Sequence, residues 1–112
     1  MFPDDHQDKF DRLRRHFMSG LPQREAEIEE YTATLLEHGV DHPALEGLHR
    51  AAHKLAGICA TYGLHRLGHL AEKAEALLER SQSQVPCDAQ MEDILVATDL
   101  LTEELGCVIE TA

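Results

Sequence analysis

The spacing of apolar residues constrains this chain more than any other feature, because they recur at steps of three and four rather than in strict alternation. Such spacing places apolar side chains on one face of an α-helix. Turn-forming residues interrupt the pattern at four places: Gly20 to Pro22, Gly39 to Pro43, Gly63, and Val85 to Asp88. The segments between them predict five helices, at about residues 5–18, 22–38, 44–62, 64–81 and 88–110.

The connections between these segments are short, which makes consecutive helices antiparallel. We therefore expect an all-α fold, an antiparallel up-and-down four-helix bundle with an additional N-terminal capping helix. A chain of 112 residues is enough for one small domain but not for two. We expect residues 1–112 to form a single helical bundle domain.

The charge balance narrows the possible partners. The chain has 10 basic and 21 acidic residues, a formal net charge of −11 with neutral histidines, which disfavours nucleic acid and anionic membrane surfaces as partners. No apolar run approaches the roughly 20 residues of a membrane span, and the first residues lack the pattern of a signal peptide. We expect a cytoplasmic protein that acts as a monomer, with no nucleic-acid or membrane partner.

Charge is unevenly distributed along the chain. Residues 44–70 carry a formal charge of +2, from Arg50, Lys54 and Arg66 against Glu46, whereas the remainder carries −13. The same segment contains four of the eight histidines. A basic, histidine-rich region in an acidic domain indicates a docking face for an acidic partner.

His53 is the candidate functional residue in this region. With Ala52 and Leu55 facing the core, the helical phase turns His53 about 100° away, onto the outer surface. Gly57 follows one turn later on the same side. Glycine inside a helix costs about 1 kcal/mol relative to alanine, and we interpret Gly57 as clearance that exposes the imidazole to another protein.

The segment from His53 to Gly63, HKLAGICATYG, resembles the signature of histidine-containing phosphotransfer (HPt) domains. The family pattern has a histidine, a hydrophobic residue two positions later, a glycine four positions later and an aromatic–glycine pair that closes the helix. These positions are occupied here by His53, Leu55, Gly57, Tyr62 and Gly63. The five-helix layout extends the similarity to nearly the whole chain.

This resemblance implies a phosphoryl carrier in a two-component phosphorelay. His53 would accept a phosphoryl group from one receiver-domain aspartate and deliver it to another, and such a receiver can belong to a hybrid histidine kinase. In this family the magnesium ion, the acidic pocket and the catalytic lysine belong to the receiver. We therefore expect no enzyme activity of the chain's own, no cofactor and no metal, with Mg²⁺ in the partner receiver domain.

The resemblance also suggests supporting residues. Many family members have lysine three residues after the histidine, where this chain has Ala56, so Arg50 or Lys54 is expected to support the phosphoryl charge instead, with Arg50 better placed by helical phase. Folding the third and fourth helices back across Gly63 brings Glu75 level with His53, at a position where the family often has glutamine. We expect Glu75 to fix the tautomer of the imidazole.

Two alternatives remain open. A helical adaptor that binds a signalling partner without phosphorylation is favoured by Ala56. A metal site is suggested by the pairs His49/His53 and His65/His69, each with the i,i+4 spacing of metal-binding histidines. At 1.5 Å per residue, however, the pairs lie roughly 18 Å and 6 Å from the Gly63 turn, so we do not expect them to meet.

Overall fold

The helices of the chain follow the periodicity of its sequence. A computed structural model describes residues 3–112, and this range contains five α-helices and one 3-10 turn but no strand. The elements are α1 (Pro3–Ser19), α2 (Leu21–His38), α3 (His42–Ile58), η1 (Cys59–Tyr62), α4 (His65–Ser83) and α5 (Asp88–Thr111). The all-α prediction is therefore confirmed. Within residues 3–112, none of the helices combines the length and the apolar character needed to cross a membrane.

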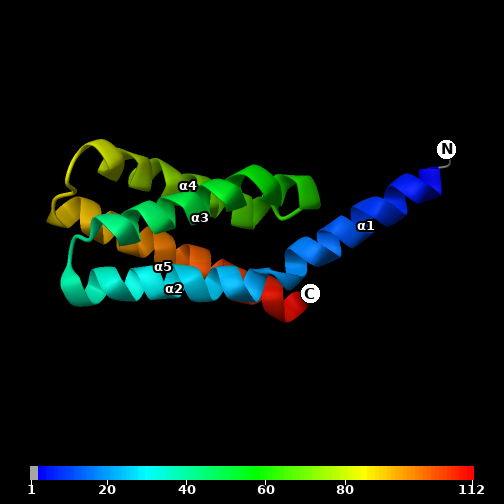
Figure 1. Ribbon diagram of the computed structural model, residues 1–112, viewed down its shortest axis with the longest axis horizontal. Helices are drawn as coiled ribbons and strands as arrows, with labels where there is room; N and C mark the ends of the chain where they lie inside the picture. The colour runs from blue at the N-terminus through cyan, green and yellow to red at the C-terminus, as the bar shows by residue number, and fades with distance from the viewer. Residues whose placement is uncertain (1–2) are drawn as a thin grey trace.

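Helices α2 to α5 form the bundle. Each packs against the next one in the chain, and α5 also packs against α2, so that the four helices enclose one core. Figure 1 shows them side by side, with their connections at alternate ends. Large aliphatic side chains from all four helices are buried in this core: Leu21, Ile28, Leu35, Leu45, Leu48, Leu55, Leu67, Leu78, Ile94, Leu101 and Leu105. Burial of each such side chain stabilises the fold by roughly 1.5–3 kcal/mol, so each of these four helices keeps its apolar face toward the core.

The third helix is shorter than its sequence pattern predicts. Its start is capped by Asp41, whose Oδ2 accepts a hydrogen bond from the backbone N–H of Ala44 at 3.0 Å. Its α-helical part ends at Ile58 rather than at residue 62, and η1 forms a tighter last turn. Gly63 follows with a φ of 78°, a left-handed conformation that glycine adopts without steric cost. The chain then turns back into α4, the helix with which α3 makes its most extensive contact.

Helix α1 projects away from the bundle (Figure 1). The Phe10 and Phe17 rings pack against Tyr62, with ring centroids 5.5 Å and 5.2 Å from it. The Nε–H of Arg14 donates to the Tyr62 carbonyl at 3.0 Å. These contacts join α1 to the turn between α3 and α4, while the rest of α1 extends outward and the molecule reaches 54 Å in its longest dimension. The capping role expected for α1 remains a prediction.

The contact between α2 and α3 depends on a glycine. A Cβ atom built at Gly47 would lie 2.6 Å from Cε2 of Tyr31, far inside van der Waals contact. Gly47 is buried, and the Tyr31 ring therefore occupies the space that any other residue would need. Glycine at this position therefore allows α2 to pack closely against α3.

Cys59 packs as a small apolar side chain at the end of α3. It is fully buried, and burial raises the pKa of its thiol to about 11, although the nearby charge of Arg24 partly opposes this shift. The thiol therefore stays protonated near neutral pH. Cys87 and Cys107 are exposed, and all three cysteines are free.

Candidate functional site

His53 lies on the outer surface of α3, in the half of the helix that leads to the Gly63 turn. Its side chain is 70% exposed, whereas Ala52 and Leu55 beside it are buried. The helical phase explains this contrast, because successive residues are turned by about 100°. The imidazole is therefore open to a partner protein.

The hydrogen-bond partner of His53 comes from α4. Nδ1 of His53 forms a short hydrogen bond with Oε2 of Glu75. An ionised carboxylate only accepts hydrogen bonds, so the proton lies on Nδ1 and the imidazole donates. In the neutral ring, Nε2 then keeps its lone pair on the side away from Glu75. This tautomer is the one a nucleophilic Nε2 requires.

Glu75 is well shielded from water for a carboxylate. Its side chain is only 22% exposed, and its helix neighbours Ala74 and Leu78 are buried. A carboxylate withdrawn from water is stabilised only when it is hydrogen-bonded, and His53 provides that bond. The contact therefore orients both side chains across the α3–α4 pair.

Small residues leave the surface beyond His53 open. A Cβ atom built at Gly57 would meet no atom within 4 Å, so packing inside the domain does not require glycine there. Ala60, one turn further toward the Gly63 turn, is exposed as well. The part of α3 that follows His53 thus presents little side-chain bulk to a partner.

The two cations expected to support a phosphoryl group lie on the other side of His53 from Glu75. Arg50 and Lys54 line a hollow of about 280 Å³ between α2 and α3, together with Arg24 and Tyr31. The Nη1 of Arg50 is 3.3 Å from Oε1 of Glu46, a pair in which both side chains are about 60% exposed. No ion pair or hydrogen bond joins either cation to His53 within residues 6–112.

His49 is a neighbour of His53 whose position the motif did not indicate. The two rings are nearly parallel, at an angle of 18°, with centroids 6.4 Å apart. The Nε2 atom of His49 is buried without a hydrogen-bond partner. The i,i+4 spacing of the two residues predicts this proximity, and the contact limits the positions open to the His53 ring from the side facing the start of α3.

The histidine pairs considered as metal ligands are not brought together. No group of three or more His, Cys, Asp or Glu side chains in the described part of the chain is arranged to hold a metal ion. The side chain of His53 is instead hydrogen-bonded to Glu75. His65 and His69 are exposed on the first turns of α4.

A comparison with protein families identifies the domain. Residues 1–107 match the Hpt domain, the histidine-containing phosphotransfer domain. The match covers nearly the whole chain, so the chain belongs to the Hpt domain family, and the resemblance seen between His53 and Gly63 is confirmed. Hpt domains are phosphoryl carriers of histidine–aspartate phosphorelays rather than catalysts. Searches of curated proteins and of solved structures found no match to this chain.

Substitution of Glu75 tests the hydrogen bond to His53. Glu75→Gln retains an acceptor for the Nδ1 proton and should preserve most phosphoryl acceptance. Glu75→Leu removes the acceptor. A hydrogen bond to a charged group contributes about 1.5–3 kcal/mol, which corresponds to a loss of roughly 10- to 100-fold in transfer rate if it acts in the transition state. Single-turnover transfer from a phosphorylated receiver measures the rate.

Two further measurements make this test specific. Glu79→Leu, at an exposed acid one turn later in α4, should leave transfer unchanged. The ¹⁵N chemical shifts of His53 should report a protonated Nδ1 in the native protein and in Glu75→Gln, but a mixture of tautomers in Glu75→Leu. Wild-type transfer by Glu75→Leu would show that the hydrogen bond has no role in the reaction.

Two glycines of α3 should respond oppositely to the same substitution. Gly57→Ala adds a methyl group in open space and should stabilise the fold by up to about 1 kcal/mol, because alanine is the better helix former. Gly47→Ala forces the added methyl group against Tyr31 and should destabilise the fold by about 1–3 kcal/mol. Urea unfolding of the two variants measures the difference, and destabilisation by Gly57→Ala would mean that the helix surface at this position is not open.

Proposed function

We propose that His53 is the phosphoryl acceptor of this domain and that it exchanges the phosphoryl group with aspartates of receiver domains. The observation that carries the proposal is the hydrogen bond from Nδ1 to Glu75, which leaves Nε2 of an exposed imidazole free to react. Membership in the Hpt family supports the reaction class. His53 is also the histidine that occupies the family motif.

The proposed step is an in-line phosphoryl transfer. The lone pair of Nε2 attacks the phosphorus of an aspartyl phosphate on the receiver, so that a P–N bond forms while the P–O bond to the aspartyl oxygen breaks. The aspartate leaves as a carboxylate, and the Nδ1 proton stays on the ring, where Glu75 stabilises the cationic character of the phosphorylated imidazole. The reverse step delivers the phosphoryl group to a second receiver.

We propose that the chain contributes the nucleophile, its orientation and a docking surface, and that it needs no cofactor or metal of its own. The receiver supplies the Mg²⁺ and the acidic pocket. Residues 1–112 act in this proposal as one domain, and α1 stabilises the turn between α3 and α4 through its contacts with Tyr62. Because Gly57 has no side chain and Ala60 has only a methyl group, the receiver surface can approach His53 closely.

The cations beside His53 suit an acidic receiver. Arg24, Arg50 and Lys54 line the same hollow at the α2–α3 surface, and exposed charges of this kind accelerate the association of oppositely charged partners. Lys54 has no ion-pair partner within residues 6–112, whereas Arg50 is paired with Glu46. We therefore expect Lys54 to contribute more to docking than Arg50, although helical phase alone favours Arg50.

One observation favours the alternative of a non-phosphorylated adaptor. Ala56 replaces the lysine common in the family, and neither Arg50 nor Lys54 is bonded to His53. A receiver could then dock on the same surface without transferring a phosphoryl group. Direct measurement of transfer separates this alternative from the proposed function.

Replacing His53 should abolish phosphoryl acceptance without disturbing the fold. His53→Gln keeps a side-chain N–H that can donate to Glu75 at an exposed position, so it should change the free energy of unfolding by only about 0.5 kcal/mol. The measurements are transfer of labelled phosphate from a phosphorylated receiver, circular dichroism and thermal unfolding. His69→Gln, at another exposed histidine, is the control and should accept phosphate normally. Continued labelling of His53→Gln would place the acceptor elsewhere.

Removing a cation beside His53 should slow receiver association. Exposed ion pairs contribute about 0.2–1 kcal/mol, so Lys54→Ala should reduce the association rate roughly 1.4- to 5-fold, and the effect should weaken as salt is added. Lys73→Ala is the matched control, because Lys73 lies on the α4–α5 side of the bundle. Stopped-flow binding at two salt concentrations measures both, and equal effects of the two variants would mean that docking does not use this charge.

A further inference from the structure

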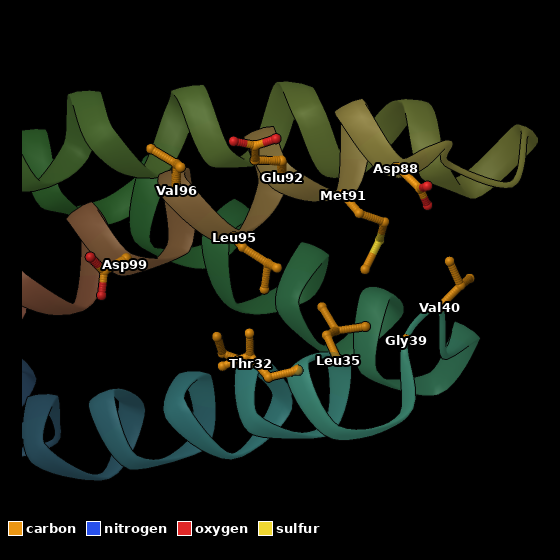
Figure 2. Close-up of a pocket in the computed structure, with 11 residues that line it drawn as sticks. Thr32, Leu35, Gly39, Val40, Asp88, Met91, Glu92, Leu95, Val96 and Asp99 are labelled. Atoms are coloured by element: carbon orange, nitrogen blue, oxygen red, sulfur yellow. The ribbon is translucent and has the colours of Figure 1, made fainter.

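An open groove with an apolar floor lies between α2 and α5, on a side of the bundle that the phosphotransfer site does not use. Its volume is about 580 Å³. Figure 2 shows Met91 and Leu95 of α5 extending toward Thr32 and Leu35 of α2, with Val40 at one end. The groove lies where α2 ends and α5 begins, at the end of the bundle away from α1 (Figure 1).

Several apolar side chains of this groove are unusually open to water. Leu36 is 68% exposed, Val96 is 54% exposed and Val40 is 40% exposed. A contiguous exposed apolar surface of this kind indicates an interaction site.

The edge of the groove is acidic. Asp88, Glu92 and Asp99 lie along its α5 side, and none of the lining residues is Lys, Arg or His. A ligand that covers the apolar floor therefore meets three carboxylates and no cation. An apolar segment that carries basic residues complements this groove.

Helix α1 has these properties. Residues 9–17 contain four lysine or arginine residues and one aspartate, a formal charge of +3 with the histidine neutral. Leu13 is 58% exposed and Phe10 is 37% exposed. Lys9 and Arg12 lie beside Leu13 around one hollow on the same face of the helix. This helix thus carries an apolar stripe flanked by cations. Amphipathic helices of this kind bind apolar grooves through their apolar face.

We propose that the occupant of the α2–α5 groove is α1 of a second copy of this chain. The hydrogen bond from Arg14 to Tyr62 and the packing of Phe10 on the Tyr62 ring direct each α1 away from the groove of its own bundle. The groove and the projecting α1 lie at opposite ends of the long axis. A two-fold axis perpendicular to that axis brings the α1 end of each chain to the groove end of the other, so that both contacts form at once in the proposed dimer.

The dimer covers surface that the monomer leaves exposed. Leu13 of one chain lies against Leu36 and Val96 of the other, and Lys9 and Arg12 face the carboxylates of α5. His53 lies on the α3–α4 surface and stays accessible, so the proposal does not depend on the phosphotransfer role. It replaces the expectation of a monomer, which rested on sequence alone.

Charge reversal tests the pairing. Light scattering coupled to size exclusion, over a wide range of protein concentration, should give the mass of two wild-type chains. The variants Lys9→Glu/Arg12→Glu and Glu92→Lys/Asp99→Lys should each be monomers, because each confronts like charges across both contacts. An equimolar mixture of the two variants should dimerise again, since every α1 then meets a groove of opposite charge.

Matched valines test the apolar part of the contact. Val96→Glu should weaken the dimer by at least about tenfold, which corresponds to about 1.4 kcal/mol. Val85→Glu, at a valine of similar exposure outside the groove, should not. Circular dichroism checks that all variants are folded.

Three results would overturn the proposal. The first is a wild-type chain that stays monomeric at every concentration, whether α1 projects from the bundle or folds back over the groove of its own chain. The second is a dimer that both charge variants still form, which would place the interface elsewhere. The third is a mixture of the two folded variants that remains monomeric.

Discussion

The register between α3 and α4 is the constraint on which the site depends. A shift of one residue along either helix moves a side chain by 1.5 Å and turns it by about 100°, which would separate Glu75 from His53. Gly63, in its left-handed conformation, sets this register, because it closes α3 and returns the chain into α4 within a few residues. The core leucines of both helices then hold it. The orientation of the exposed His53 is therefore maintained by the buried side of the same helix pair.

Much of this arrangement could be predicted from the sequence. The three- and four-residue spacing predicted five helices, and the structure has five α-helices within residues 3–112. Folding the third and fourth helices together across Gly63 predicted that Glu75 lies level with His53, and the two are hydrogen-bonded in the structure. The role of this hydrogen bond in phosphotransfer is a proposal. Periodicity was sufficient here because helical phase and a single short turn determine which residues share a surface.

Other features depend on contacts that periodicity does not contain. The pairing of Arg50 with Glu46 is an exception, because the i,i+4 spacing of the two residues on one helix face predicts it. The outward direction of α1 depends on packing of its aromatic rings against Tyr62. The end of α3 at Ile58 results from a local tightening into 3-10 geometry, which apolar spacing does not distinguish from a continued α-helix. The groove between α2 and α5 is visible only once both helices are placed.

Glycine has two different uses within α3, and they separate the fold from the function. Gly47 is required by the packing of Tyr31, so its cost in helix stability is offset inside the domain. Gly57 has no such contact with the described residues, so packing at this position does not offset its cost in helix stability. A residue that lowers helix stability beside an exposed histidine is consistent with selection for access by a partner. In the proposed function Gly57 therefore belongs to the docking surface, whereas Ala52 on the other side of the helix belongs to the core.

The position of the phosphoryl group on the ring tests the central claim most directly. The protein is phosphorylated by a phosphorylated receiver, and ¹H–¹⁵N correlation spectra at alkaline pH, where phosphohistidine is stable, identify the substituted nitrogen of His53. The hydrogen bond between Nδ1 and Glu75 predicts a phosphoryl group on Nε2 of His53. Phosphate on Nδ1 of His53, on another histidine or on a carboxylate would contradict the account.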